Sequence, residues 1–336
     1  MKATLIIVAA AIAAFAGSTF HRDWHAFRAI AQSDANVDVY VVGDVHADDQ
    51  RLKRVLAAAG VIDRQNAWSA GNAVVIFMGD LIDKGPHPVD VIGFVESLRR
   101  AAREQGGEVY SLIGNHEAEF LADATAKKSQ EFAEDLEKHH IRPADVADCR
   151  GDIGTFLCTE PFGLRIRDWF FSHGGNTHGR TLSALEAELE KGVDRDGFAS
   201  GELVGDDSLL EARLGEKGEN GRPWVESGPQ HDARALLREY TQALGVKHIV
   251  QAHQHAEIVF ADGLRRKKGQ MFQRDGMLFL VDTGMSEGVD DSDGAVMLIK
   301  APPREEAIAI CADGTRTKIW DPKTLTALGA ARACGR

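Results

Sequence analysis

Five short motifs in this sequence contain side chains that ligate metal ions or carry protons, and four of the five also contain glycine. Their polar residues are carboxylates, a carboxamide and imidazoles, a mixed oxygen and nitrogen set that suits Mn, Fe or Zn better than Ca or Mg. The motifs are Gly43-Asp44-Val45-His46, Gly79-Asp80-Leu81-Ile82-Asp83-Lys84-Gly85, Gly114-Asn115-His116-Glu117, His173-Gly174-Gly175 and Ala252-His253-Gln254. The pattern predicts a centre that binds divalent metal ions.

Hydrolysis of a phosphate monoester explains why such a set would occur together. The reaction needs a strong nucleophile and neutralisation of the charge on the phosphoryl oxygens. Two metal ions about 3.5–4 Å apart share one hydroxide and clamp the phosphate. A carboxylate must bridge the ions, and a histidine should protonate the leaving oxygen. One such motif alone is an ordinary turn, but five in this order indicate two-metal hydrolysis.

Each motif follows a short, β-rich apolar run, which we interpret as a buried strand. The predicted strands cover residues 37–42, 73–78, 108–113, 169–172, 248–252 and 277–281. Polar groups gather at the carboxyl ends of strands in α/β sheets, so the motifs are expected to converge at one edge.

Helical patterns lie between these runs. Asp48 or Asp49 begins a predicted helix that Gly60 ends, and Pro88 begins a second one. The alternation of strands and helices predicts an α/β sandwich. The stretch 277–321 has strands without helices, so part of the sheet is expected to be antiparallel.

The motifs resemble those of the calcineurin-like metallophosphoesterases, and within them the phosphoprotein phosphatase family, closest to its bacterial Shewanella-like branch. The resemblance covers about residues 37–290. It implies an α/β fold of four layers, an αββα sandwich with mixed sheets. We therefore predict a catalytic domain over 37–300 and C-terminal strands and a tail over 301–336.

The resemblance also implies a role for each metal ligand. Asp44 and His46 would hold the first metal, and Asp80 would bridge both. The remaining ligands, for the second metal, would be Asn115, His173 and His253. The implied cofactors are two divalent metal ions.

Catalysis and phosphate binding are assigned in the same way. His116 would be the general acid, and Asp83 would orient it. Lys84 and Asn115 would bind the phosphate of the substrate.

The sequence departs from the family pattern at three places. Ala47 stands where the family usually has glycine, a change of little cost if the backbone there does not need a positive φ. Lys84 replaces an arginine, which would grip phosphate in a bidentate fork. A further family arginine has no clear match here, the nearest candidates being Arg222 and Arg234.

Two segments interrupt the alternation of strands and helices. Residues 121–148 are charged and helical in pattern, and residues 185–222 are acidic and glycine-rich. We predict both as inserted helical or loop segments over the strand ends, where they would form a lid over the substrate. The alternative is a solvated helical face beside a loop.

The expected function is that of a protein phosphatase acting on phosphoserine, phosphothreonine or phosphotyrosine, with a phosphorylated protein or peptide as partner. A bis-nucleoside tetraphosphate hydrolase is the first alternative, and Glu117 and the Ala252-His253-Gln254 motif favour the phosphatase over it. A non-catalytic metal-binding module is the second alternative. The intact His116 and Asp83 argue against such a module.

Charge and the N-terminal segment restrict the location and the partners. The net charge of −12 disfavours nucleic acid and anionic membranes. Lys2, an apolar run over 3–16 and the small-residue pattern Ala14-Phe15-Ala16 predict a signal peptide over residues 1–16, cleaved after Ala16. The expected location is secreted or periplasmic, and an uncleaved membrane anchor is the alternative.

Four cysteines in an exported chain suggest two disulfides. They are Cys149, Cys158, Cys311 and Cys334. Three connectivities are open, and we favour local pairing of the first with the second and of the third with the fourth. The alternative leaves some of them free, with Cys311 as a plain core residue.

Overall fold

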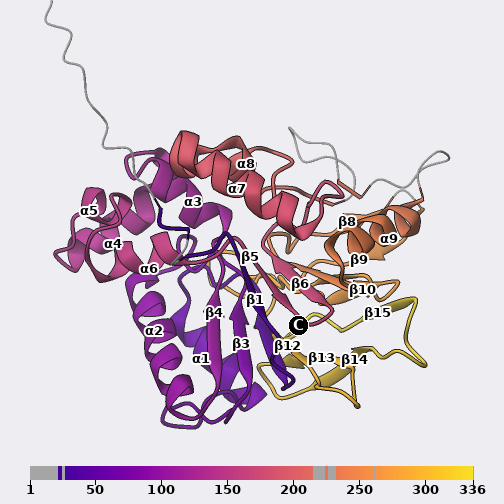
Figure 1. Ribbon diagram of the computed structural model, residues 1–336. Coiled ribbons are helices and arrows are strands. Elements are labelled where there is room, and N and C mark those ends of the chain that lie inside the picture. The colour runs from indigo at the N-terminus through magenta and orange to yellow at the C-terminus, as the bar shows by residue number, and fades with distance from the viewer. Residues whose placement is uncertain (1–21, 25–26, 215–223, 226–231, 261, 336) are drawn as a thin grey trace, which may run out of the picture.

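The computed structural model describes residues 22–24, 27–214, 224–225, 232–260 and 262–335. The predicted signal peptide and Arg222 lie outside these residues. Figure 1 shows two β-sheets with helices around them. Within the described ranges, no helix is long and apolar enough to cross a membrane.

The first sheet has six strands in the order β14-β13-β12-β2-β3-β4. β2, β3 and β4 are parallel, whereas β12, β13 and β14 join them as an antiparallel meander. The bounds are β2 (Val39–Val42), β3 (Val74–Phe77), β4 (Glu108–Ser111), β12 (Ala295–Ile299), β13 (Ala307–Cys311) and β14 (Arg316–Trp320). The expected mixture of parallel and antiparallel strands is confirmed.

The second sheet has seven strands in the order β1-β5-β6-β7-β11-β10-β15. β6, β7 and β11 are parallel neighbours at its centre. The bounds are β1 (Ile30–Ser33), β5 (Gly163–Ile166), β6 (Trp169–Ser172), β7 (His248–Gln251), β10 (Phe272–Arg274), β11 (Leu278–Leu280) and β15 (Leu328–Ala330). A separate two-stranded ribbon pairs β8 (Ile258–Val259) with β9 (Arg265–Arg266).

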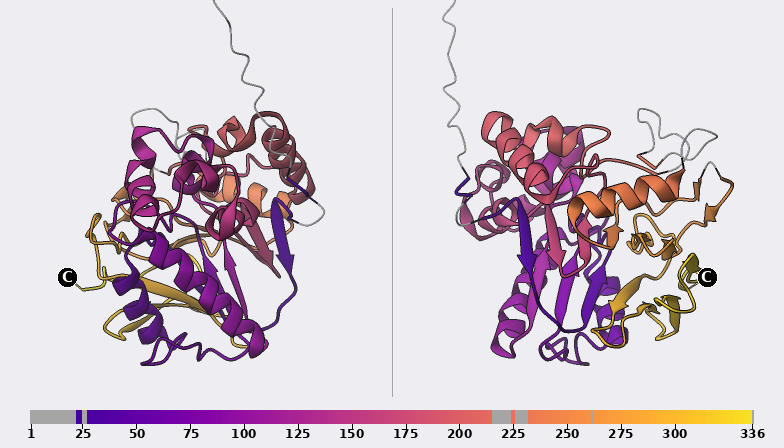
Figure 2. Two further views of the ribbon diagram at one scale, coloured as in Figure 1. Left: turned by 90° about the vertical axis from the view of Figure 1, so that its left-hand side faces the viewer. Right: turned by 45° about the vertical axis from the view of Figure 1, so that its right-hand side comes forward.

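Two helices cover the outer face of the first sheet, α1 (Asp49–Ala59) and α2 (Pro88–Glu104). The left view of Figure 2 looks onto them. Asp48 caps α1 by accepting a hydrogen bond from the Arg51 backbone N–H at 2.9 Å. Gly60 ends that helix with φ 79°, in the left-handed region that glycine adopts without strain. The two helices therefore begin where the sequence predicts.

The remaining helices lie mainly over the strand ends and beside the second sheet (Figure 1). The helices of the first predicted insertion pack close to α3, which begins within the third motif. They are α3 (Asn115–Ala122), η1 (Lys127–Ser129), α4 (Gln130–Lys138), α5 (Pro143–Ala147), α6 (Gly151–Thr159), α7 (Leu182–Asp196), η2 (Gly197–Ala199), α8 (Gly201–Val204) and α9 (Ala233–Leu244). The acidic segment 185–222 thus contains most of a long helix.

The two sheets pack face to face and enclose a core of their own. Val41 and Ile76 of the first sheet belong to it, as do Phe171 and Val250 of the second. The side chains that alternate with these point outward and pack under helices. The layers are therefore helix, sheet, sheet and helix, and the predicted αββα sandwich is confirmed.

Both predicted disulfides are present, and all four cysteines are paired. Cys149, which follows α5, bonds to Cys158 of α6, and Cys311 bonds to Cys334. The local connectivity is thereby confirmed. The bonds join cysteines that are 9 and 23 positions apart, so the effect of each on the entropy of the unfolded chain is modest.

A buried histidine far from the motif loops predicts an acid-sensitive step in stability. His248 begins β7, stacks on Trp169 with 4.0 Å between ring centroids, and hydrogen-bonds through Nδ1 to the Gly276 carbonyl. Burial lowers the pKa of His248 from 6.5 to about 4. Between these values the unfolded chain binds the extra proton, so stability falls as pH falls, by about 3 kcal/mol.

We expect His248→Gln to remove that part of the pH dependence. Urea unfolding at several pH values between 7 and about 4 would measure it. The variant loses absolute stability at every pH, but its curve should be flatter than that of the parent. An exposed control, His140→Gln, should keep the parental slope. Equal slopes for His248→Gln and the parent would contradict the assignment.

Candidate metal and catalytic centre

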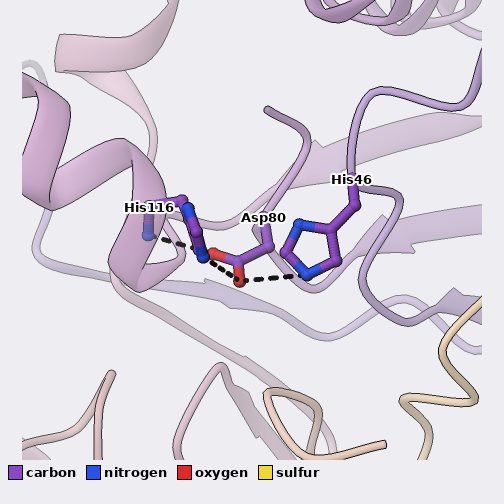
Figure 3. Close-up of side chains that lie close together, drawn as sticks. All are labelled: His46, Asp80 and His116. Carbon is purple, nitrogen blue, oxygen red and sulfur yellow. Dashed lines mark hydrogen bonds and ion pairs between the residues drawn. The ribbon is translucent and has the colours of Figure 1, made fainter. Parts of the chain in front are cut away.

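The five motifs converge at the edge of the sandwich where β2, β3, β4, β6 and β7 end. Asp80, in the loop after β3, lies at the centre. Its Oδ2 atom is 3.3 Å from His173 Nε2, 3.8 Å from His46 Nε2 and 3.9 Å from His116 Nε2. Figure 3 shows the Asp80 carboxylate between the rings of His46 and His116. One carboxylate therefore faces imidazoles from three other motifs.

Two groups of candidate ligand atoms share this carboxylate. His46, Asp80 and His116 form the first, and Asp80, His173 and His253 form the second. In each group the ligand atoms lie within 4.8 Å of one another. A carboxylate common to two adjacent groups is the arrangement that a bridging ligand between two metal ions requires.

Asp44 and Asn115 extend these two groups. Asp44 Oδ2 is 3.8 Å from His46 Nε2, and Asn115 Oδ1 is 3.1 Å from His173 Nε2. His253 Nε2 is buried and has no hydrogen-bond partner in the described structure. A buried nitrogen in this condition costs free energy unless a partner such as an ion meets it. The donor set and the unpaired nitrogen therefore fit divalent metal ions.

The buried charges at this edge depend strongly on one another. Burial opposes charge on His173, yet the carboxylates of Asp80 and Asp44 raise the pKa of His173 to about 10. Burial lowers the pKa of His46 to about 3. A ring must be deprotonated at the nitrogen that binds a metal. Metal binding at His173 is therefore expected to release a proton.

His116 lies beside this cluster with an orienting carboxylate behind it. Its Nδ1 is 2.8 Å from Asp83 Oδ2. Burial opposes the positive charge, but Asp80 and Asp83 raise the pKa of His116 above 6.5. The ring thus has an anchored nitrogen on one side and the Asp80 carboxylate on the other, as a positioned proton donor needs.

The cations predicted to grip phosphate differ in their positions. Lys84 Nζ is 3.2 Å from His46 Nε2, so this lysine lies at the cluster. The Lys84 backbone N–H donates to Glu131 of α4 at 2.7 Å, which fixes the first insertion against the second motif. Arg234 instead pairs with Asp275 at 3.5 Å, in the β10–β11 turn at the opposite end of the sheet. Arg234 therefore lies away from the motif residues, because its side chain pairs with that turn.

Strained backbone is concentrated in the motif loops. Positive φ values at non-glycine residues are rare and costly, and they mark sites where the surroundings impose a conformation. Thirteen described non-glycine residues have one. Those in the motif loops are His46, Ala47, Asp80, Asp83, Lys84 and His253.

The structure shows whether the backbone at Ala47 needs a positive φ. Its φ is 55°, so the backbone does need the left-handed region where the family usually has glycine. The substitution is therefore not free of cost, because a Cβ in this region adds about 1–2 kcal/mol.

We expect Ala47→Gly to stabilise the protein by about 0.5–1 kcal/mol, since the relief of strain exceeds the added entropy of the unfolded chain. Ala57→Gly is a matched control on the exposed side of α1, where glycine should cost about 1 kcal/mol. Thermal unfolding of both variants measures the two shifts. A loss of stability in Ala47→Gly would show that packing of the buried methyl outweighs the strain.

Glu117 is a functional residue that we did not assign from the sequence. Its carboxylate is buried and accepts hydrogen bonds from the backbone N–H groups of Asp80, Leu81 and Gly114 at 2.7–2.8 Å. It thus ties the second motif to the third. Gly114 is required there, because a Cβ would lie 2.4 Å from the Asp80 nitrogen. The signal was present: a glutamate three residues after a helix N-cap is the capping-box pattern.

Two further carboxylates come close to the motifs without belonging to them. Asp282 follows β11, and its charge contributes after burial to raising the pKa of Asp44. Glu211 lies in the segment after α8, with Oε2 3.8 Å from His253 Nε2. Asp282 ends a predicted strand and could be placed from the sequence. No pattern in the sequence indicated that Glu211 would lie near the motifs.

Comparison with known proteins gives the following matches. The profile of the calcineurin-like phosphoesterase family matches residues 37–257. Shewanella-like protein phosphatase 2 of Arabidopsis thaliana is 34% identical over 76 residues, which are 23% of this chain and 19% of that protein. The symmetrical bis(5'-nucleosyl)-tetraphosphatase of Vibrio campbellii is 25% identical over 136 residues, 40% of this chain and 44% of that protein. The matches thus span less than half of these relatives.

A solved structure with the same fold is the cold-active protein-tyrosine phosphatase of a psychrophilic Shewanella species. It superposes with a TM-score of 0.64 at 21% identity, over 87% of this chain and 82% of the other. At that identity the likeness establishes the fold.

Proposed function

Because the chain belongs to the calcineurin-like phosphoesterase family, we propose that it is a metal-dependent hydrolase of phosphate monoesters that acts on phosphorylated side chains of proteins. We rest this on one observation above all. The Asp80 carboxylate is shared by two groups of metal-ligand atoms, and the His116–Asp83 pair lies directly beside it. The similarity to a Shewanella-like protein phosphatase supports a phosphoprotein as the substrate.

Two divalent ions, held by Asp44, His46, Asp80, Asn115, His173 and His253, would supply a water nucleophile of lowered pKa and neutralise phosphoryl charge. The residues of the chain would do the rest. Lys84 places an ammonium at the same edge, where it would bind a phosphoryl oxygen. His116, held by Asp83, would give its proton to the leaving oxygen of the side chain.

We expect Lys84→Arg to tighten the binding of inorganic phosphate. A guanidinium presents two parallel donors to phosphate, whereas an ammonium acts as a point charge. The gain should be about 1 kcal/mol, or roughly fivefold in the inhibition constant. Lys53→Arg, on α1 and paired with Asp49, is the matched control and should change nothing. An unchanged or weaker inhibition by phosphate in Lys84→Arg would remove Lys84 from the phosphate site.

We also propose that the protein works in an oxidising compartment, either outside the cell or in a periplasm. The pairing of all four cysteines in disulfides supports this, because such bonds persist where thiols are not kept reduced.

The decisive experiment is phosphate release by the purified chain with added Mn²⁺. The substrates are matched phosphoserine, phosphothreonine and phosphotyrosine peptides and diadenosine tetraphosphate. Chelator-sensitive release from one or more peptides supports the proposal and ranks the side chains. Cleavage of the nucleotide alone would favour the tetraphosphatase alternative, and no turnover with two ions bound would favour a non-catalytic module.

A further inference from the structure

Glu211 faces His253 at the edge of the proposed metal centre, although none of the five motifs contains it. It follows α8, in the acidic segment predicted as an insertion. Its Oε2 atom is 3.8 Å from His253 Nε2, and its side chain is 17% exposed. In the described part of the chain, no lysine or arginine lies within 4.0 Å of this carboxylate.

The atom that Glu211 faces is the one left without a partner. His253 Nε2 is buried and makes no hydrogen bond with any described residue. The side chain of His253 is 3% exposed, so bulk water does not satisfy it. A carboxylate oxygen and an imidazole nitrogen are both ligand types that Mn, Fe and Zn accept, and here the two atoms face each other.

The separation agrees with two ligands of one ion. Ligand atoms about 2.0–2.2 Å from a metal lie about 3 Å apart when adjacent and about 4.2 Å apart when opposite. The 3.8 Å between Glu211 and His253 falls in this interval. It equals the 3.8 Å that separates His46 from Asp44 and from Asp80 in the other group.

The backbone holds Glu211 in this position. Ser208 Oγ accepts from the Glu211 backbone N–H at 3.1 Å and donates to the Leu203 carbonyl at 2.6 Å. The Gly174 N–H of the fourth motif donates to the Leu209 carbonyl at 2.7 Å. Gly174 is needed for this approach, because a Cβ there would lie 2.7 Å from the Leu210 backbone. The turn that carries Glu211 is therefore built onto the loop that carries His173.

We propose that Glu211 supplies a carboxylate ligand to the metal ion held by Asn115, His173 and His253. This rests on the two-metal site proposed above. The second metal would then have a ligand from outside the motifs, and its binding would fix the segment after α8 over the centre. Nearby, Glu119 pairs with Lys128 and also hydrogen-bonds the Glu211 side chain, so that Glu211 has Glu119 on one side and His253 on the other.

The test is a titration of chelator-stripped protein with Mn²⁺. Binding is measured by calorimetry and by the electron paramagnetic resonance signal of free Mn²⁺. The parent should bind two ions. In Glu211→Gln, the affinity for one of them should fall about 10–100-fold or more, and the other should be unchanged. Glu202→Gln, which removes the same charge on α8 away from the centre, is the matched control and should bind both ions normally.

Glu211→Ala should reproduce the loss, and thermal unfolding in chelator should show that both variants still fold. Parental affinities for both ions in the two Glu211 variants would overturn the inference, as would an equal loss in Glu202→Gln. If the parent itself binds fewer than two ions, the two-metal function fails as well. The readout is metal binding, so the inference can fail while phosphate release stands.

Discussion

His116→Gln is expected to lower kcat by about 10²–10⁴-fold and to leave the content of bound Mn²⁺ unchanged. The imidazole is anchored through Nδ1 by Asp83 at 2.8 Å, which leaves Nε2 to face the cluster. Because glutamine has no group that titrates near neutral pH, the leaving oxygen would have to take its proton from water. Turnover of a phosphopeptide and metal analysis of the same sample measure both quantities.

The structure adds a second role for His116 that the same experiment can test. His116 Nε2 is 3.9 Å from Asp80 Oδ2, and the ring belongs to one of the two groups of ligand atoms. It could therefore bind a metal instead of donating a proton. A loss of one Mn²⁺ in His116→Gln would assign the ring as a ligand, and unchanged turnover would exclude both roles.

Asp83, the residue that orients His116, supplies a second variant for comparison with His116→Gln. Asp83→Asn should keep the hydrogen bond to His116 but remove the negative charge that favours the imidazolium. We expect a smaller fall in kcat and a downward shift of the basic limb of the pH profile, because Asp83 is among the groups that raise the pKa of His116. A pH profile identical to that of the parent would contradict the orienting role.

Asp80→Asn is expected to lower kcat/KM by at least about 10³-fold and to reduce the bound Mn²⁺ from two ions to at most one. Asp80 is the carboxylate common to both ligand groups. Without its second negative oxygen the two ions lose the anion between them, and the charge stabilisation they supply is worth several kcal/mol. Metal analysis after gel filtration and turnover with excess Mn²⁺ test this.

A surface carboxylate provides the comparison. Asp90 on α2 has a side chain that is 58% exposed, and Asp90→Asn should keep two ions and full turnover. Two tightly bound ions in Asp80→Asn would show that another carboxylate bridges the metals. The buried Asp282 and Asp44 are the nearest alternatives.

The sequence alone was sufficient to predict the elements and the meeting of the motif residues at one edge of the sandwich. Short apolar runs followed by polar residues predicted β2, β3, β4, β6, β7 and β11, because strands buried on both faces are mostly apolar and polar groups gather at their ends. The caps at Asp48 and Gly60 predicted the ends of α1. These signals depend on residues that are close together in the sequence, so one sequence is enough to recognise them.

Only the tertiary structure decided what depends on segments far apart in the chain. Arg234 was a candidate by its position in the sequence, but α9 places it at the opposite end of the sheet beside Asp275. Ala47 has a positive φ, which the presence of an alanine in the sequence does not indicate. Glu211 meets His253, 42 positions later, because the segment after α8 folds back onto Gly174. Such contacts arise from packing between elements, so the pattern of residues along one strand or helix cannot predict them.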